Sequence, residues 1–323
     1  MNTLQKRKER VAILSVMSNS LLVVFKLIVG LLIGSVAIIS EAIHSAMDLL
    51  ASFIALFSVK KSYLPADDAH PFGHGKFESI SGLVEAALIF IAAFWIIFEA
   101  VKKFTSSQQI EAPAWGVAVM LFSAVMNYIV SRNLFKVGRE ADSIALEADA
   151  WHLRTDVYTS LGVMCSLLVI WIGRHFWTGL NLYWLDPAAA IFIAIFILKA
   201  AYDLTSRALG DLIDAKLPAD EENWIRKIIA DHQPDIRGFH RLKTRKAGNF
   251  RFVEFHIKVN PQMSVTSSHE ITRNLKITIF NKLPNATINI HVEPCDGNCT
   301  DECAAGCFLE KEQRPGFFLN PAG

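Results

Sequence analysis

Long apolar runs, separated by short charged loops, occupy the first two thirds of the chain. Six of these runs contain the ~20 mostly apolar residues that a helix needs to cross the hydrocarbon core of a bilayer. They lie approximately at residues 11–33, 36–59, 79–101, 113–137, 144–172 and 182–204. The fifth run is the least apolar of the six. The pattern predicts an α-helical membrane protein with six transmembrane helices in a domain of residues 1–210.

The pattern changes after about residue 211, where charged residues mix with short runs that alternate between apolar and polar positions. A helix is predicted to open at Pro218, because proline followed by acidic residues suits the positive end of a helix. Strands near 236–245, 250–259 and 286–293 and a second helix near 265–282 follow. The order α-β-β-α-β predicts a compact α+β domain of residues 211–294. Residues 295–323 are interpreted as a tail that contains four cysteines.

Charge limits both the partners and the orientation of the chain. The net charge of +1 argues against a nucleic-acid partner, because no strong basic field is present to neutralise phosphates. An N-terminus inside the cell leaves only three basic residues near the outer ends of the spans: Lys102, Lys103 and Arg174. The basic residues then on the inner side are Lys6, Arg7, Lys8, Arg10, Lys60, Lys61, Lys76, Arg132, Lys136, Arg139 and Arg207. This excess predicts a multi-pass protein of the cell (inner) membrane with both termini in the cytoplasm.

Two of the predicted spans carry a histidine and an aspartate four residues apart. The second span contains His44 and Asp48, and the fifth contains His152 and Asp156. Residues four apart lie on one helix face, with Cβ atoms about 6 Å apart. An ionisable group inside a bilayer costs roughly 2.5–3.5 kcal/mol on insertion scales, so such groups usually mark function. The alternative is that these polar residues only hold the helix bundle together.

Two opposed faces of this kind supply two imidazole nitrogens and two carboxylates, which is a tetrahedral ligand set that Zn²⁺ accepts. On these motifs the chain resembles the cation diffusion facilitator family of metal/proton antiporters, over roughly residues 10–294. The resemblance implies that His44, Asp48, His152 and Asp156 form the transport site, in the version associated with zinc. It also implies a homodimer in the lipid bilayer, protons as the counter-substrate, and a cytoplasmic domain with a metallochaperone-like (ferredoxin-like) fold.

The loop after the second span contains a further group of candidate ligands. Asp67, His70 and His74 resemble the loop metal site of some members of the same family. Gly73 and Gly75 make this loop flexible enough to hold a metal ion weakly and to capture it. The alternative is that both histidines are ordinary loop residues near the lipid headgroups.

Alternation along the predicted strands places several histidines on the polar face of the soluble domain. Val253, Phe255, Ile257 and Val259 share one face of their strand, so His256 lies on the other. The same reasoning puts His291 and Glu293 on a polar face. His240 lies on the first strand, and His269 opens the second helix. The order and spacing of these five residues resemble the binuclear cytoplasmic site of the family, which is expected to regulate transport by drawing two domains together.

The tail contains Cys295, Cys299, Cys303 and Cys307, one cysteine every four residues. On a straight helix these four thiols would extend over about 18 Å, too far for one ion. A folded loop could instead bind one metal, and a helix could present two pairs of thiolates. The family does not require the cluster. Metal or redox function and inert thiols in a disordered tail therefore remain open.

The predicted function is efflux of Zn²⁺ from the cytoplasm by proton-coupled antiport, with Cd²⁺ or another divalent transition metal as the alternative substrate. Imidazole has an ordinary pKa near ~6.5, so protons and metal can compete for the same ligands. The two alternative classes of protein are a membrane metalloenzyme and a membrane-anchored zinc sensor. A membrane metalloenzyme would need an open coordination position and a general base, and no His-Glu-x-x-His sequence occurs. A membrane-anchored zinc sensor would not need ionisable groups within the bilayer. We therefore expect a transporter and not an enzyme.

Overall fold

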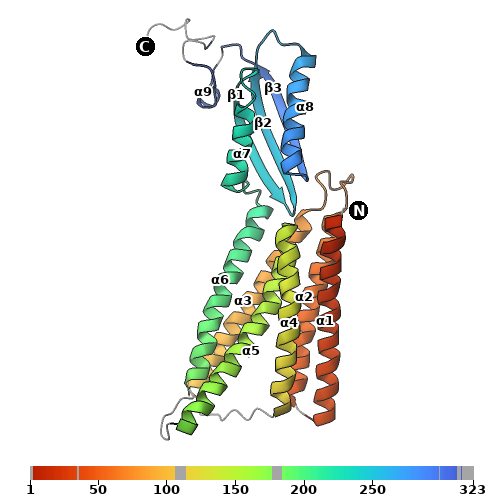
Figure 1. The fold of residues 1–323 in the computed structure, drawn as a ribbon, viewed down its shortest axis with the longest axis vertical. Helices are drawn as coiled ribbons and strands as arrows, with labels where there is room; N and C mark the ends of the chain where they lie inside the picture. The colour runs from red at the N-terminus through yellow and green to blue at the C-terminus, as the bar shows by residue number, and fades with distance from the viewer. Residues whose placement is uncertain are drawn as a thin grey trace. The chain divides into compact units, whose positions relative to one another are not determined.

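The computed structural model describes residues 3–34, 36–105, 114–176, 184–297, 299–310 and 314. The chain divides into two compact units, Met1–Leu212 and Ile213–Gly323. The first unit consists of long helices, and the second combines helices with a small sheet (Figure 1).

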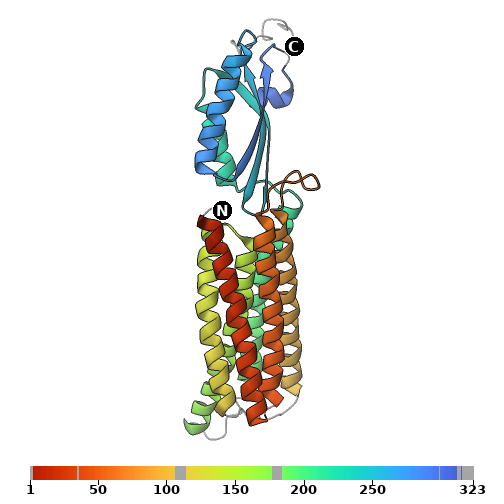
Figure 2. The same ribbon diagram turned by 90° about the vertical axis from the view of Figure 1, so that its right-hand side faces the viewer.

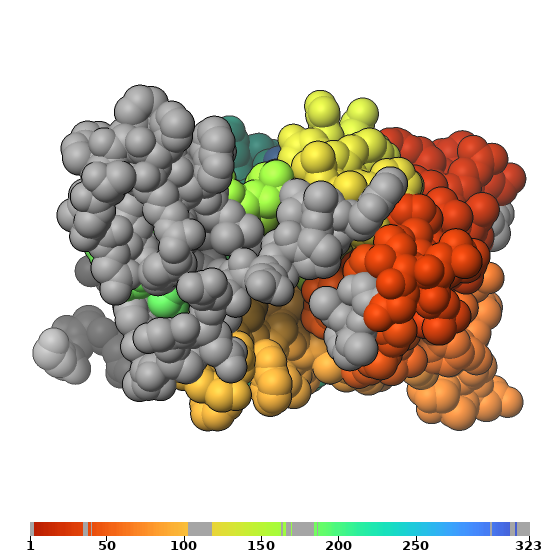
Figure 3. Space-filling model, turned by 90° about the horizontal axis from the view of Figure 1, so that it is seen from below, coloured from red at the N-terminus to blue at the C-terminus, as the bar shows by residue number. Residues whose placement is uncertain are grey.

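Six long helices form the first unit, as the apolar runs predict. They are α1 (Thr3–Ile33), α2 (Val36–Ser62), α3 (Lys76–Thr105), α4 (Ala114–Glu140), α5 (Ile144–Phe176) and α6 (Leu185–Leu212). The closest neighbours are α1 with α2, α3 with α6, and α4 with α5 (Figures 1 and 2). The end-on view in Figure 3 shows α4, in yellow, beside α1, in red.

Five of these helices, α1, α2, α3, α4 and α6, are long and apolar enough within the described residues to cross a membrane. The remaining helix, α5, carries acidic and basic residues between Glu147 and Asp156. It packs against α2, α3, α4 and α6, so those polar groups face other helices. Small residues bring the helices close together, such as Ala86, Ala93 and Ala201 in the core between α3 and α6. The helical membrane fold predicted from the sequence is confirmed.

A buried ion pair ties α1 to α3 near one end of the bundle. Lys8 is 1% exposed, and its ammonium group binds the carboxylate of Glu78, which is fully buried. Glu78 also accepts hydrogen bonds from the hydroxyl groups of Ser62, at 2.8 Å, and Ser143. Four segments of the chain therefore meet at one carboxylate.

Replacing Lys8 by alanine should destabilise the protein by about 3–5 kcal/mol, because Glu78 would remain buried without its counter-charge. The thermal unfolding midpoint of the purified protein in detergent measures this effect. Lys6→Ala is the matched control, because Lys6 lies on the same helix and is exposed. Equal unfolding midpoints for the two variants would contradict the importance of the buried pair.

The second unit contains the predicted α-β-β-α-β order. Its elements are α7 (Ala219–Ala230), β1 (Ile236–Ala247), β2 (Phe250–Val259), α8 (Val265–Lys282), β3 (Ala286–Pro294) and the short α9 (Asp301–Ala305). The sheet order is β1-β2-β3, with β1 and β2 antiparallel and β2 and β3 parallel. The α+β fold predicted from the sequence is confirmed.

Helices α7 and α8 cover one face of this sheet. Ile225 and Ile229 of α7 pack with Leu275 and Ile279 of α8 against the buried strand residues Val253, Phe255, Ile257 and Val259. The apolar positions of β2 therefore face the helices, as the alternation predicts, and its polar positions lie on the opposite face. Residues 299–310 also belong to this unit, where α9 contacts β1.

Candidate metal centre

The helices α2 and α5 bring the four predicted ligands of the membrane unit together. Each histidine pairs with the aspartate of the other helix. Nε2 of His152 lies 3.0 Å from Oδ1 of Asp48, and Nε2 of His44 lies 3.6 Å from Oδ1 of Asp156. Ligand atoms of His44, Asp48 and Asp156 also lie within 4.8 Å of one another. Three of the four candidate ligands therefore already lie together, and His152 joins them through its contact with Asp48. A set of two nitrogens and two oxygens suits a tetrahedral ion.

The two halves of this membrane site differ in exposure. The Asp48 side chain is only 3% exposed and that of His152 is 12% exposed, whereas His44 is 55% exposed. His44, Asp48 and Asp156 line a cavity of about 200 Å³ together with residues of α1 and α4. An ion entering the cavity would therefore meet His44 and Asp156 before the buried pair.

Two residues that the sequence analysis missed border the same cavity. Nδ2 of Asn127, on α4, donates a hydrogen bond to Oδ2 of Asp156 at 3.3 Å. Lys26, on α1, is buried, donates to the hydroxyl of Ser45 at 2.8 Å and pairs with Glu41 at 3.2 Å. A polar residue within an apolar run is the available signal for both, but only the packing of α1 and α4 brings them to the cavity.

A second polar network lies one turn before His152. Asp149 is fully buried on α5 and accepts a hydrogen bond from Ser52 of α2 at 2.9 Å. Ser52 in turn contacts Ser15 and Asn19 of α1. The network joins α1, α2 and α5 behind the metal-ligand candidates, so it helps to hold the faces of α2 and α5 opposite each other.

Arg154 points away from the four ligands. Its guanidinium lies over the rings of Tyr128 and Phe135, 4.6 and 5.7 Å from their centroids. Such stacking stabilises a cation against an aromatic face.

The loop candidates also lie together. Oδ1 of Asp67 lies 3.1 Å from Nδ1 of His70, and Oδ2 lies 3.4 Å from Nε2 of His74. The backbone N–H of His70 donates to Asp67 at 2.6 Å, and this hydrogen bond lowers the pKa of the Asp67 carboxyl group. Asp67 is therefore a carboxylate near neutral pH, which is the form that binds a cation.

In the second unit, strand register places three histidines side by side on the polar face. His240 is paired with His256, and His256 is paired with His291. Glu293 reaches all three rings: its carboxylate lies 3.4 Å from Nε2 of His240, 2.8 Å from Nδ1 of His256 and 3.8 Å from Nε2 of His291. Ligand atoms of His240, His256 and Glu293 lie within 4.8 Å of one another.

The electrostatics of this sheet site favour the metal-binding forms of its side chains. Burial raises the pKa of Glu293, but hydrogen bonds from Lys258 and His256 outweigh it and lower the pKa to about 2. Burial lowers the pKa of His240. Near neutral pH, Glu293 is therefore ionised and His240 is neutral, as coordination requires. Nδ1 of His240 is buried without a hydrogen-bond partner among the described residues, and this donor set fits a zinc ion.

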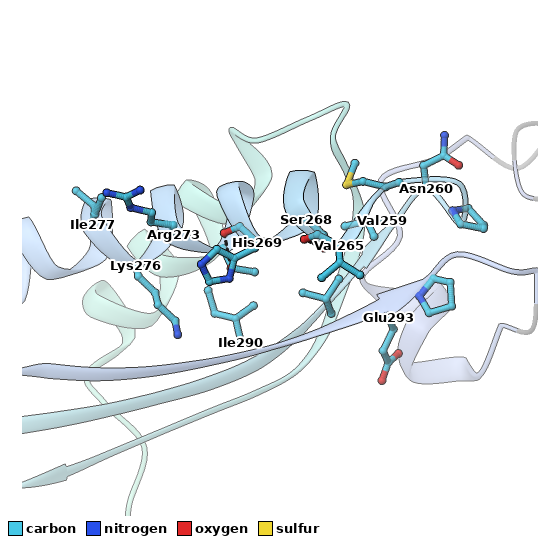
Figure 4. A pocket seen from close by; sticks show the side chains of 15 residues that line it. Val259, Asn260, Val265, Ser268, His269, Arg273, Lys276, Ile277, Ile290 and Glu293 are labelled. Carbon is cyan, nitrogen blue, oxygen red and sulfur yellow. Dashed lines mark hydrogen bonds between the residues drawn. The ribbon is translucent and has the colours of Figure 1, made fainter.

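His269 is not brought to the other four residues of the predicted cytoplasmic site. It lies on α8, beside a cavity of about 850 Å³ between that helix and the sheet. Figure 4 shows the ring of His269 on the helix side of β3, whereas the side chain of Glu293 extends on the other side. Within one chain, the sheet therefore separates His269 from the histidine row.

Comparison with protein families finds matches along most of the chain. The family model described as the cation efflux transmembrane domain matches residues 12–213. A second model, described as the cation efflux protein cytoplasmic domain, matches residues 217–295. The first match covers the membrane unit, and the second ends at Cys295.

Individual relatives extend over both units. The uncharacterized transporter sll1263 of Synechocystis sp. is 32% identical over 263 residues, which cover 81% of this chain and 83% of that protein. The cation-efflux pump FieF of Cronobacter sakazakii is 29% identical over 286 residues, which cover 88% of this chain and 92% of that protein. A solved structure, the metal-bound C-terminal domain of the CzcD transporter from Thermotoga maritima, is 26% identical with a TM-score of 0.22 and covers 24% of this chain and 94% of that one.

Proposed function

Because this chain belongs to the cation efflux family, also called the cation diffusion facilitator family, and is a multi-pass membrane transporter of divalent cations, we propose that its substrate is Zn²⁺. The family resemblance predicted from the sequence is confirmed. The observation that carries the zinc proposal is the pairing of His44 and His152 with Asp156 and Asp48 across α2 and α5. Imidazole together with carboxylate suits Zn²⁺, whereas an all-oxygen set suits Mg²⁺ or Mn²⁺.

Proton coupling is the second part of the proposal. Each imidazole of the membrane site lies against a carboxylate, so an arriving ion must take the place of these contacts. Metal binding needs neutral imidazoles and ionised carboxylates, and it therefore displaces any protons that these groups carry. Protons returning from the other side of the membrane would release the ion and restore the histidine–aspartate pairs. The site would thus exchange Zn²⁺ for protons.

We further propose that the transporter works as a homodimer in the cell (inner) membrane, with both termini in the cytoplasm. The excess of Lys and Arg on one side of the spans supports this orientation. The loop of Asp67, His70 and His74 would then face the cytoplasm and could capture the ion before transport.

Regulation by cytoplasmic zinc is the last part of the proposal. His240, His256, His291 and Glu293 would hold the regulatory ion on the polar face of the sheet. A ligand can shift an equilibrium only through its different affinities for the two states. If zinc prefers the arrangement with two domains drawn together by ~100-fold, saturating zinc stabilises that arrangement by about 2.7 kcal/mol. His269, on the other face, is available to contact a second copy of the domain.

Uptake of ⁶⁵Zn²⁺ into proteoliposomes, with and without a pH gradient, tests the transport proposal. An antiporter should accumulate zinc against its gradient when the vesicle interior is acidic, and collapse of the gradient should abolish accumulation. A facilitator without proton coupling would equilibrate zinc at any pH. A sensor or an enzyme would not accumulate it.

Changing His44 to aspartate should broaden selectivity toward Mn²⁺. The substitution turns the membrane set of two nitrogens and two oxygens into one nitrogen and three oxygens, and oxygen ligands favour harder ions such as Mn²⁺. Competition of unlabelled Mn²⁺ and Cd²⁺ with ⁶⁵Zn²⁺ uptake measures the change. His232→Asp is the matched control, because His232 belongs to none of the candidate sites, and it should leave the selectivity of transport unchanged. An unaltered zinc preference in His44→Asp would count against His44 as a selectivity element.

A further inference from the structure

The four cysteines of residues 295–310 lie at one end of the sheet. Cys295 directly follows β3, and its N–H donates to the carbonyl of Val259 at the end of β2 at 2.8 Å. Cys303 lies within α9, and Cys307 forms a bridge with Gly238 near the start of β1. All four are free thiols. Segments after β3 and beside β1 therefore converge on the same end of the domain.

Backbone contacts join the residues around Gly306 to β1. The N–H of Phe239 donates to the carbonyl of Gly306 at 3.0 Å, and the N–H of Phe308 donates to the carbonyl of Arg237 at 2.8 Å. A Cβ atom at Gly306 would lie 1.8 Å from the carbonyl oxygen of Phe239, so only glycine allows this approach. The ring of Phe308 packs 5.8 Å from that of Phe239. The segment is therefore folded against the domain, which disfavours the interpretation of inert thiols in a disordered tail.

The start of α9 brings two of the thiols onto one turn. The hydroxyl of Thr300 accepts a hydrogen bond from the N–H of Cys303 and so caps the helix. Cys299 immediately precedes this cap and acts electrostatically on Cys303. Cys295 and Cys303 are buried, Cys307 is half-buried and Cys299 is exposed. One ligand therefore remains accessible to an ion in solution.

Two basic side chains, Arg237 and Lys258, lie near the buried thiols. Burial raises the pKa of both Cys295 and Cys303. The charge of Arg237 lowers the pKa of Cys295, and the charge of Lys258 lowers that of Cys303, but burial has the larger effect. Four thiolates around a divalent ion carry a net charge of −2, and Arg237 and Lys258, which also binds Glu293, would offset part of it.

We propose that Cys295, Cys299, Cys303 and Cys307 bind one Zn²⁺ ion as a tetrathiolate site, separate from the histidine row. Four thiolates complete a tetrahedron and leave no open position, which is the arrangement of structural zinc sites. The cysteines are not among the groups of described residues whose ligand atoms already lie within 4.8 Å, so the ion would draw the thiols closer together. Binding would lock residues 295–310 against β1.

This site lies next to the histidine row without sharing its ligands. Lys258 binds Glu293 at 2.9 Å and also acts on Cys303, so it lies between the two groups. The family model of the cytoplasmic domain ends at residue 295, before three of the four cysteines. The tetrathiolate site is therefore an addition of this chain to the domain, and it does not depend on the proposed transport of zinc.

Cobalt titration of the full-length protein in detergent tests the proposal. The protein is first reduced and treated with chelator, then titrated with Co²⁺ without oxygen. Thiolate ligands give a sulfur-to-cobalt charge-transfer band that histidine and carboxylate ligands do not give. We expect this band to saturate at one cobalt per chain and to disappear when Zn²⁺ displaces the cobalt. Cys299→Ser should lower its intensity, because one of the four cobalt–sulfur bonds is lost, and this exposed position is the one least needed for folding.

Two controls separate this site from the rest of the protein. Cys165→Ser changes the exposed cysteine of α5 and should leave the band intact, and His240→Ala with His256→Ala should do the same. A missing band, a band of unchanged intensity in the variant with both Cys299→Ser and Cys303→Ser, or a disulfide between tail cysteines would overturn the proposal. Purified protein with bound iron and sulfide and a brown absorption would assign the thiols to an iron–sulfur cluster and reject the zinc site.

Discussion

Zn²⁺ transport should fall by more than about 100-fold when Asp48 or Asp156 is replaced by alanine. Loss of a residue that only supports a metal ligand typically lowers metal affinity or activity by about 10–100-fold. Each of these carboxylates is itself a candidate ligand, so a larger loss is expected. Asp48→Ala also leaves His152 without its contact at 3.0 Å, and Asp156→Ala removes the contact of His44. Initial rates of ⁶⁵Zn²⁺ uptake into proteoliposomes measure the loss.

Asp203→Ala is the matched control for this experiment. Asp203 is also an aspartate of a membrane helix, α6, but it is exposed and lies outside the cavity. Its variant should transport at the rate of the unchanged protein. If Asp48→Ala or Asp156→Ala still transported zinc at that rate, the four-ligand site between α2 and α5 would not be the transport site.

The second large effect is expected on the polar face of the sheet. Replacing both His256 and Glu293 by alanine should abolish zinc binding to the histidine row and remove any activation of transport by cytoplasmic zinc. The reason is geometric, because Glu293 contacts all three histidines and His256 lies at the centre of the row. Titration calorimetry on the full-length protein in detergent should show at least one ion fewer per chain.

His232→Ala is the control for the sheet site. The imidazole of His232 contacts the carbonyl of Ile228 at 2.8 Å, within its own helical turn, and it belongs to none of the candidate sites. The regulatory proposal requires that basal transport of the double variant persists while its stimulation by zinc is lost. Unchanged calorimetric stoichiometry, or full stimulation in the double variant, would reject a regulatory ion at this position.

The predicted loop and membrane sites differ in how much long-range structure they need. Asp67, His70 and His74 lie within eight consecutive residues, so a single turn is enough to bring them together. The membrane site pairs residues on two helices, such as His152 and Asp48, that lie 104 positions apart, and the network from Asp149 through Ser52 to α1 helps to align the helices. We therefore regard the packing around Asp149 as part of what shapes the membrane site.

The amino-acid sequence by itself determined the class of the fold and the residue types of the candidate sites. An apolar run long enough to span a bilayer is a local property, and so is the four-residue spacing that puts His44 and Asp48 on one helix face. Strand alternation is local as well, and it correctly separated Phe255, in the core, from His256, on the polar face. These features follow from the periods of helices and strands, which act over only a few residues.

Tertiary structure decided which side chains meet. No local pattern could say that His152 pairs with Asp48, that Lys26 and Asn127 border the same cavity, or that Glu41 binds Lys26. The row of three histidines depends on the register of β1, β2 and β3, with a register shift after His240, and the side on which α8 packs leaves His269 beyond the sheet. The docking of the cysteine segment on β1 likewise joins residues about 70 positions apart. Such contacts depend on how whole elements pack, because many residues along both segments contribute to the free energy that brings the two segments together.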